Sequence, residues 1–163
     1  MFYLNIFFIF AISGYILETI TFFVINKPYN SSILYGPWTP IYGIASLIMV
    51  VVYLIIKKLK FSLKKEKIIY FITIALVLTI LEGIAGYIIE ITQNKIYWNY
   101  DNLIFNVGHY MTLEISLIWG FLAFISMYLI IPKIKKIINK IPKLVTMVIL
   151  GLFIVDCIIT FYS

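Results

Sequence analysis

Residues 68–92 read IIYFITIALVLTILEGIAGYIIEIT, a long apolar run in which Glu82 and Glu90 are the only charged residues. A helix needs about 20 apolar residues to cross the hydrocarbon core of a bilayer. The run is preceded by a group of six lysines: Lys57, Lys58, Lys60, Lys64, Lys65 and Lys67. This stretch predicts a transmembrane helix with a strongly basic segment at its N-terminal end.

Four more apolar runs have a suitable length, at residues 2–25, 40–56, 111–131 and 144–162. The chain is 63% hydrophobic and 12% charged, whereas soluble domains carry about 25% charged residues. Open sheets cannot span lipid, and the alternation typical of a barrel is absent. The sequence therefore predicts an all-α polytopic transmembrane helical bundle of about five spans, as one domain of residues 1–163. Pro132 and Pro142 are expected to bracket the last loop.

A second group of lysines follows the fourth run: Lys133, Lys135, Lys136, Lys140 and Lys143. The two groups fall on one side of the membrane, which the positive-inside rule makes cytoplasmic. The N-terminus is then cytoplasmic and the C-terminus extracellular, with outer connections at residues 26–39 and 93–110. The net charge of +6 is explained by contact with the lipid bilayer, so no nucleic-acid partner is expected. Because every basic residue is Lys, in a chain rich in Ile, Asn and Tyr, the composition favours a bacterial plasma-membrane protein.

Two parts of the chain share short motifs. The pattern Gly-Tyr-Ile-aliphatic-Glu begins at Gly14 and again at Gly86, and Ile41-Tyr42-Gly43 is echoed by Ile118-Trp119-Gly120. Two spans per copy preserve direction, so the motifs predict a parallel internal hairpin repeat. Transporter folds often place a binding site between such repeats. The copies would occupy residues 5–57 and 77–131, with a fifth helix at 144–162.

Five of the seven acidic residues lie within or beside the apolar runs: Glu18, Glu82, Glu90, Glu114 and Asp156. In the predicted orientation all of them lie in the outer half of the bilayer. A carboxylate in hydrocarbon costs several kcal/mol, so such groups are protonated, face water or face a cation. Glu114 also suits the positive end of a helix dipole, and Asp156 is equally compatible with a functional and a structural role.

Acidic and aromatic residues together predict a binding cavity. Glu82, Gly86 and Glu90 share one helix face, and Gly83 and Gly86 would let another helix approach closely. Carboxylates with aromatic faces recognise organic cations, although tyrosines and tryptophans at this level also serve as lipid anchors. The predicted substrate-binding residues are Glu18, Glu82, Glu90, Glu114, His109, Tyr15, Tyr87, Trp38 and Trp119.

Signals for enzymatic chemistry are poor. The chain has no zinc-helix motif, no nucleophile elbow and no phosphate-binding loop. We therefore predict no catalytic residue, no cofactor and no metal site. An association of His109 with glutamates around a metal has no diagnostic spacing.

A family resemblance rests on several boxes of sequence: Ser13-Gly14-Tyr15 to Glu18, Tyr35-Gly36-Pro37-Trp38-Thr39-Pro40-Ile41-Tyr42-Gly43, Leu81-Glu82 to Glu90, Trp98-Asn99-Tyr100, Asn106-Val107-Gly108-His109 and Leu117-Ile118-Trp119-Gly120. Over about residues 5–130 the chain resembles the bacterial family of putative ABC-transporter type IV membrane proteins. The resemblance implies a multi-span permease. The family tends to have Arg where this chain has His109, so the charge here would depend on pH.

The leading hypothesis is a small permease or solute-binding membrane subunit with an outward-facing acidic and aromatic cavity for a cationic small solute. Because the chain holds no ATPase, ATP-driven transport would need a separate ATPase subunit, docked on the lysine-rich cytoplasmic loops. One alternative is an intramembrane enzyme acting on a lipid or lipid-linked substrate, with Glu82 or Glu90 as general base and His109 as acid or metal ligand. Another is an assembly or regulatory subunit whose acids pair with a basic membrane partner.

Overall fold

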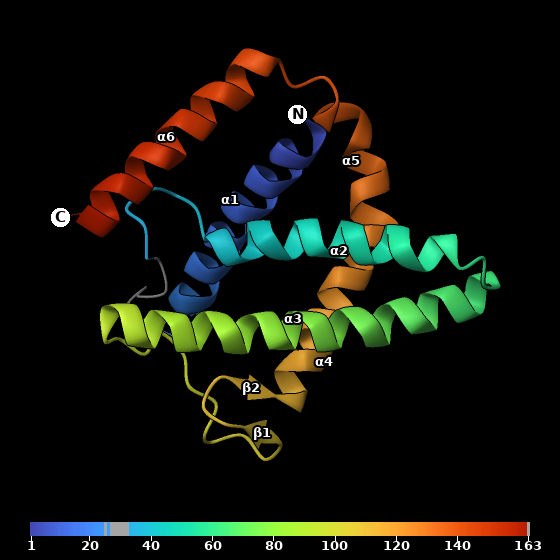
Figure 1. The fold of residues 1–163 in the computed structure, drawn as a ribbon, viewed down its shortest axis with the longest axis horizontal. Helices are drawn as coiled ribbons and strands as arrows, with labels where there is room; N and C mark the ends of the chain where they lie inside the picture. The colour runs from blue at the N-terminus through green and yellow to red at the C-terminus, as the bar shows by residue number, and fades with distance from the viewer. Residues whose placement is uncertain (25, 27–32, 163) are drawn as a thin grey trace. The chain divides into compact units, whose positions relative to one another are not determined.

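The computed structural model describes residues 1–24, 26 and 33–162, so residues 27–32 of the predicted connection at 26–39 lie outside the described residues. The described chain is mostly helical (Figure 1). In chain order the elements are α1 (Phe2–Val24), α2 (Pro40–Lys58), α3 (Leu63–Gln93), β1 (Asn106–Val107), β2 (Met111–Thr112), α4 (Leu113–Ile125), a π-helical turn (Ser126–Ile130), α5 (Ile131–Ile138) and α6 (Lys143–Tyr162).

Five helical segments of the described chain are long and apolar enough to cross a membrane: Phe2–Val24, Pro40–Lys58, Leu63–Gln93, Leu113–Ile138 and Lys143–Thr160. The predicted all-α, multi-pass class is therefore confirmed. α3 begins at Leu63, ahead of the predicted start at residue 68, because the backbone N–H of Glu66 donates to the carbonyl of Ser62 and starts the helix among the lysines. α3 ends where Asn94 adopts a left-handed conformation (φ 51°) and its N–H donates to the carbonyl of Glu90.

The prediction that Pro132 ends the fourth span was wrong. α4 continues through the π-helical turn into α5, and the helix ends only at Ile138. Proline lacks an N–H, and its ring clashes with the carbonyl four residues earlier in a regular helix. The wider π-helical turn just before Pro132 changes the hydrogen-bond spacing at this point, which lets the helix accommodate the ring.

The contacts within the chain form two compact units, residues 1–47 with 134–163 and residues 48–133. In the first unit, Asn5 is buried in α1 and bridges two later segments. Its side-chain amide donates to the carbonyl of Ile138 (3.2 Å), and Thr146 donates to its amide oxygen (2.6 Å). A buried polar group needs such partners. Asn5 therefore fixes the start of α1 to α6 and to the end of α5.

The second unit is built on α3 packed along α4. Thr79 donates to Ser116 (2.7 Å), and Gly120 allows close approach, because a Cβ there would lie 2.8 Å from that of Ala75. The opposite face of α3 carries a stripe of apolar side chains that are each more than half exposed: Ile72, Leu76, Ile80, Ile84 and Ile88. This spacing of four residues makes one continuous lipid-compatible face.

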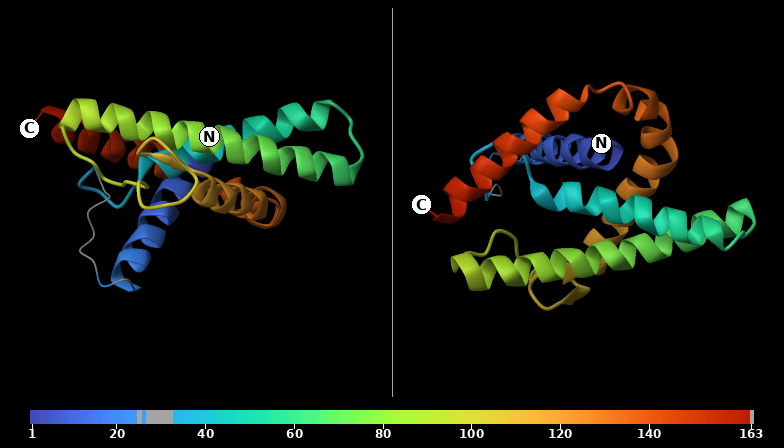
Figure 2. Two further views of the ribbon diagram at one scale, coloured as in Figure 1. Left: turned by 90° about the horizontal axis from the view of Figure 1, so that it is seen from below. Right: turned by 45° about the horizontal axis from the view of Figure 1, so that its top comes forward.

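The chain between α3 and α4 turns back on α3. The antiparallel pair β1–β2 lies beside α3 instead of beyond its end (Figures 1 and 2). Gly108 has a positive φ of 64° in the turn between these strands, a conformation that favours glycine. This return places residues of a connection against the apolar part of a spanning helix.

Candidate functional site

Glu82 is a buried carboxylate (5% exposed) in the apolar part of α3. The Tyr100 hydroxyl donates to its Oε1 (2.7 Å), and the indole N–H of Trp119 donates to its Oε2 (2.9 Å). Hydrogen bonds make a buried polar group tolerable. Both of these donors are uncharged, so among the described residues they satisfy the oxygens of Glu82 without neutralising a negative charge.

Glu90 lies two helical turns further along the same face of α3. The hydroxyl of Tyr110 donates to its Oε2 (2.9 Å). Burial raises the pKa of Tyr110, and the hydrogen bond to Glu90 raises it further, so this hydroxyl keeps its proton and acts as the donor. Tyr100 and Tyr110, both from the connection after α3, therefore each contact one glutamate of α3.

Gly83 and Gly86 do not serve helix packing as predicted. A Cβ at Gly83 would lie 2.7 Å from the sulfur of Met111, and one at Gly86 would lie 2.6 Å from the ring of Tyr110. The close neighbours are therefore side chains of the connection that folds back on α3. Here the two glycines make room for β2 and for the tyrosine that contacts Glu90.

His109 lies on the exposed rim of this connection. Its Nδ1 is 2.7 Å from a carboxylate oxygen of Asp101, and both side chains are substantially exposed (61% and 44%). The amide of Asn99 also donates to Asp101 (2.9 Å). These two contacts, with Asn99 the larger effect, hold the pKa of Asp101 below its usual range. His109 is thus part of a local polar cluster, at a different place from the oxygens of Glu82.

Glu114 lies in the first turn of α4 and contacts the hydroxyl of Thr112. A carboxylate there complements the positive end of the helix dipole. This position favours the structural reading of Glu114. Tyr87, on α3, is 60% exposed. Its sequence neighbour Gly86 is buried, so the two residues belong to different faces of the helix.

In the first unit, the predicted residue Glu18 accepts a long hydrogen bond from the hydroxyl of Thr39 (3.4 Å). The backbone N–H of Thr39 donates to the carbonyl of Ala11 (3.0 Å), which brings the start of α2 against α1. Gly14 permits this contact, because a Cβ there would clash with the ring of Tyr42. Tyr15 is half-buried beside this glycine.

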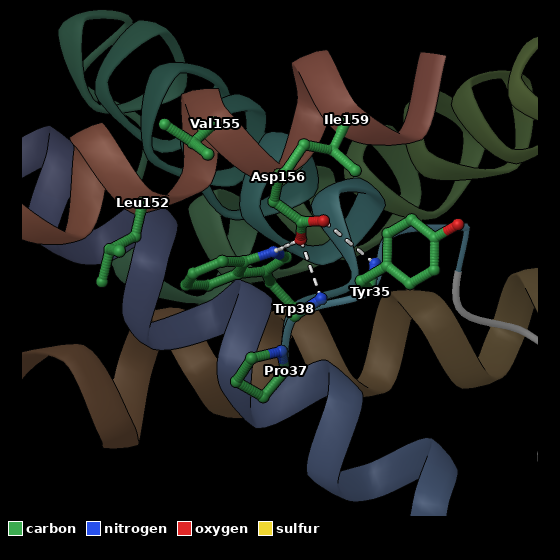
Figure 3. A pocket seen from close by; sticks show the side chains of 8 residues that line it. Tyr35, Pro37, Trp38, Leu152, Val155, Asp156 and Ile159 are labelled. Atoms are coloured by element: carbon green, nitrogen blue, oxygen red, sulfur yellow. Dashed lines mark hydrogen bonds between the residues drawn. The ribbon is translucent and has the colours of Figure 1, made fainter. Parts of the chain in front are cut away.

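Trp38 contacts Asp156, whose role the sequence left open. The indole N–H of Trp38 donates to Oδ2 of Asp156 (2.6 Å), as does the backbone N–H of Gly36 (2.8 Å). The backbone N–H of Tyr35 donates to Oδ1 (3.1 Å), and the hydroxyl of Thr160 adds a longer bond of 3.3 Å. Figure 3 shows the three donors of residues 35–38 converging on the carboxylate. Asp156 therefore attaches this loop to α6.

An open cavity of about 460 Å³ lies beside this carboxylate. Its lining is mostly apolar, and Leu152, Val155 and Ile159 of α6 face the loop across it (Figure 3). Because the oxygens of Asp156 are already taken by the loop, the cavity offers few free polar partners. These hydrogen bonds join residues 35–38 to α6, and the substrate-binding role of Trp38 stays a prediction.

The structure therefore brings some predicted residues together. Glu82 contacts Trp119 directly, and Glu90 lies on the same helix in the second unit. Trp38 instead contacts Asp156. Glu18 belongs to the first unit, so its joining with Glu82 and Glu90 into one acidic centre stays a prediction.

Two important donors were missing from the predicted site. Tyr100 was one of several aromatics at the right level, and Tyr110 carried no separate signal; both contact glutamates about 20 positions away. To predict these two donors, one would have had to know that the connection folds back onto α3. Within the part of the chain that the structure describes, no group of three or more metal-ligating side chains is gathered in one place.

The fold and these contacts define a multi-pass helical membrane protein with carboxylates held inside its spanning helices. The family model of the putative ABC-transporter type IV proteins matches residues 5–161, so the chain belongs to that family. The match extends beyond the residues that suggested the resemblance and includes α6 with Asp156. No curated protein and no solved structure matches the chain.

Proposed function

We propose that this chain is a transport subunit that binds a cationic small solute at Glu82. The observation that carries the proposal is the carboxylate of Glu82, which is buried within a spanning helix and accepts hydrogen bonds from two uncharged donors. An ionised carboxylate in such surroundings gains most from a positive partner. Family membership supports a role in membrane transport, and the carboxylate supports a cation as the solute.

The aromatic neighbours of Glu82 support the same solute class. Of these, Trp119 on α4 lies within hydrogen-bond distance of the carboxylate, so its ring is close to any group that Glu82 binds. Aromatic faces beside a carboxylate attract organic ammonium groups through cation–π interactions. Glu90 with Tyr110 would form a second contact for the solute, nearer the outer surface in the orientation that the lysines predict.

A binding experiment on the purified protein in detergent tests the proposal. Tetramethylammonium and choline serve as probes, and isothermal titration measures their affinity. We expect saturable binding that weakens at least about tenfold in Glu82→Gln, because the neutral amide offers no charge to the cation. The matched control is Glu66→Gln, which changes a carboxylate on the same helix that also accepts from a tyrosine, Tyr128.

Binding that is equal in Glu82→Gln and in the unchanged protein would remove Glu82 from the site. Failure of both probes and of further organic cations to bind at all would refute the cationic solute class. Native mass spectrometry of the protein taken from its own membranes provides a second readout, because a bound cationic molecule should then disappear in Glu82→Gln.

We further propose that a separate ATPase subunit docks on the lysine-rich segments. Lys58, Lys60 and Lys65 are exposed around the connection between α2 and α3, so they are accessible to an acidic partner surface. An ATPase should co-purify with the chain at low salt and dissociate as salt rises. Replacement of these three lysines by glutamine should reduce co-purification, whereas Lys95→Gln, in the other connection, should leave it unchanged.

A further inference from the structure

Residues 94–112 form a compact connection, which we call the cap. The backbone N–H of Tyr100 donates to the carbonyl of His109 (2.8 Å), which joins the two arms of the cap. The β1–β2 pair lies within the same segment. The cap therefore has its own internal hydrogen bonds.

Two side-chain hydrogen bonds join the cap to the glutamates of α3, and a third, from Tyr97 to Gln93, joins it to the last residue of that helix. Tyr100 donates to Glu82 (2.7 Å), and Tyr110 donates to Glu90 (2.9 Å). These glutamates are about 12 Å apart along the helix axis. Two such separate points fix both the position and the direction of the cap on α3.

The apolar contacts of the cap lie between these two points. Met111 packs against Gly83 and Tyr110 packs against Gly86, where any added Cβ would meet them below 3 Å. Tyr110 is also buried, with 7% of its surface exposed. The cap thus covers the face of α3 that carries both carboxylates.

Among the residues that the structure describes, the cap contains a buried donor that lacks an acceptor. The indole nitrogen of Trp98 is buried and has no hydrogen-bond partner among the described residues. Its ring lies edge-on to Tyr110, with centroids 6.0 Å apart. A buried N–H without an acceptor disfavours the arrangement that buries it.

We propose that the cap is a lid that regulates the Glu82 site by competition. The hydroxyls of Tyr100 and Tyr110 occupy the carboxylate oxygens that a cation would contact, so the cation binds fully only when these hydroxyls leave. This inference rests on the proposed function for its ligand. The lid itself rests on the hydrogen bonds and packing of the cap.

The test removes the two hydroxyls by Tyr100→Phe and Tyr110→Phe and keeps the rings. The control is Tyr97→Phe, because Tyr97 belongs to the same cap and donates to Gln93 (3.0 Å) instead of a glutamate. The first readout needs no solute: dicyclohexylcarbodiimide labelling of each glutamate in membranes, followed by mass spectrometry. We expect faster labelling of Glu82 in Tyr100→Phe and of Glu90 in Tyr110→Phe, with no change in Tyr97→Phe.

The second readout is the affinity for tetramethylammonium. Loss of a competing hydrogen bond should tighten binding about fivefold in Tyr100→Phe. Unchanged labelling in both tyrosine variants would overturn the proposal that the cap is a lid. Faster labelling with weaker tetramethylammonium binding would overturn the competition, because the hydroxyls would then be ligands of the solute.

The two proposals fail in different ways. Faster labelling without cation binding in any protein, the unchanged chain included, would establish the lid and refute the proposed function. If Tyr100→Phe does not fold, Tyr110→Phe with labelling at Glu90 decides the question independently, since this pair is a separate contact of the cap.

Discussion

The indole N–H of Trp119 on α4 donates a 2.9 Å hydrogen bond to the carboxylate of Glu82 on α3. This contact joins two spanning helices within their apolar parts. It therefore contributes to the packing of α3 on α4 as well as to the candidate site.

Trp119→Phe should destabilise the protein by about 1–3 kcal/mol, because it leaves one oxygen of the buried Glu82 without its donor. Chemical unfolding in detergent, followed by circular dichroism, measures the change. Trp98→Phe is the matched control, since it makes the same change in volume and removes an indole N–H that has no partner among the described residues. Equal destabilisation by the two substitutions would show that ring volume, and not the hydrogen bond, is responsible.

Asp156→Asn should be more damaging, at about 3 kcal/mol of unfolding free energy. One carboxylate oxygen becomes an NH₂ group that faces the N–H donors of residues 35–38. Thr160→Val removes only the longest of these bonds (3.3 Å) and should cost about 1 kcal/mol or less. Thermal unfolding in detergent ranks the two variants, and similar midpoints for both would contradict the attachment of the loop by Asp156.

The pH below which the cap loses stability should depend on the carboxylate of Asp101. Its folded-state pKa is lowered, first by the amide of Asn99 and then by His109. A lowered pKa stabilises the fold above the usual value of about 3.9, and this contribution is lost as the pH falls through the folded-state pKa. Carbon-detected NMR titration of the carboxyl group should give a value below the usual one, and Asn99→Ala should move it back upward. A titration at the usual value in the unchanged protein would contradict the Asn99–Asp101 contact.

The spans could be predicted from the sequence because an apolar run long enough to cross lipid must satisfy its own backbone hydrogen bonds, and a helix does so. α2 and α6 lie within two residues of their predicted limits. The exceptions are at positions where local rules compete. The helix continues past Pro132 because a π-helical turn precedes it, and α3 starts early because helix formation extends into the lysines beyond the apolar run.

The candidate site was less predictable because its contacts are between residues far apart in the chain. Glu82 and Trp119 were each singled out by residue type and position, but their hydrogen bond spans 37 residues. Trp38 and Asp156 are separated by 118 residues, and no local pattern relates them. Residue chemistry identifies which groups need partners, whereas the return of a loop decides which partners they find.

The orientation of the chain is the remaining prediction that a direct measurement can decide. Lys60 and Asn102 are exposed in the connections on either side of α3, so a cysteine at each reports one face of the membrane. Because the native chain has a single cysteine, Cys157→Ser gives a clean background. In intact cells a membrane-impermeant maleimide should label Asn102→Cys at once and Lys60→Cys only after permeabilisation, since lysine-rich connections stay in the cytoplasm. The reverse pattern would place Glu82, Glu90 and the cap toward the cytoplasm, and an outward-facing site would then be excluded.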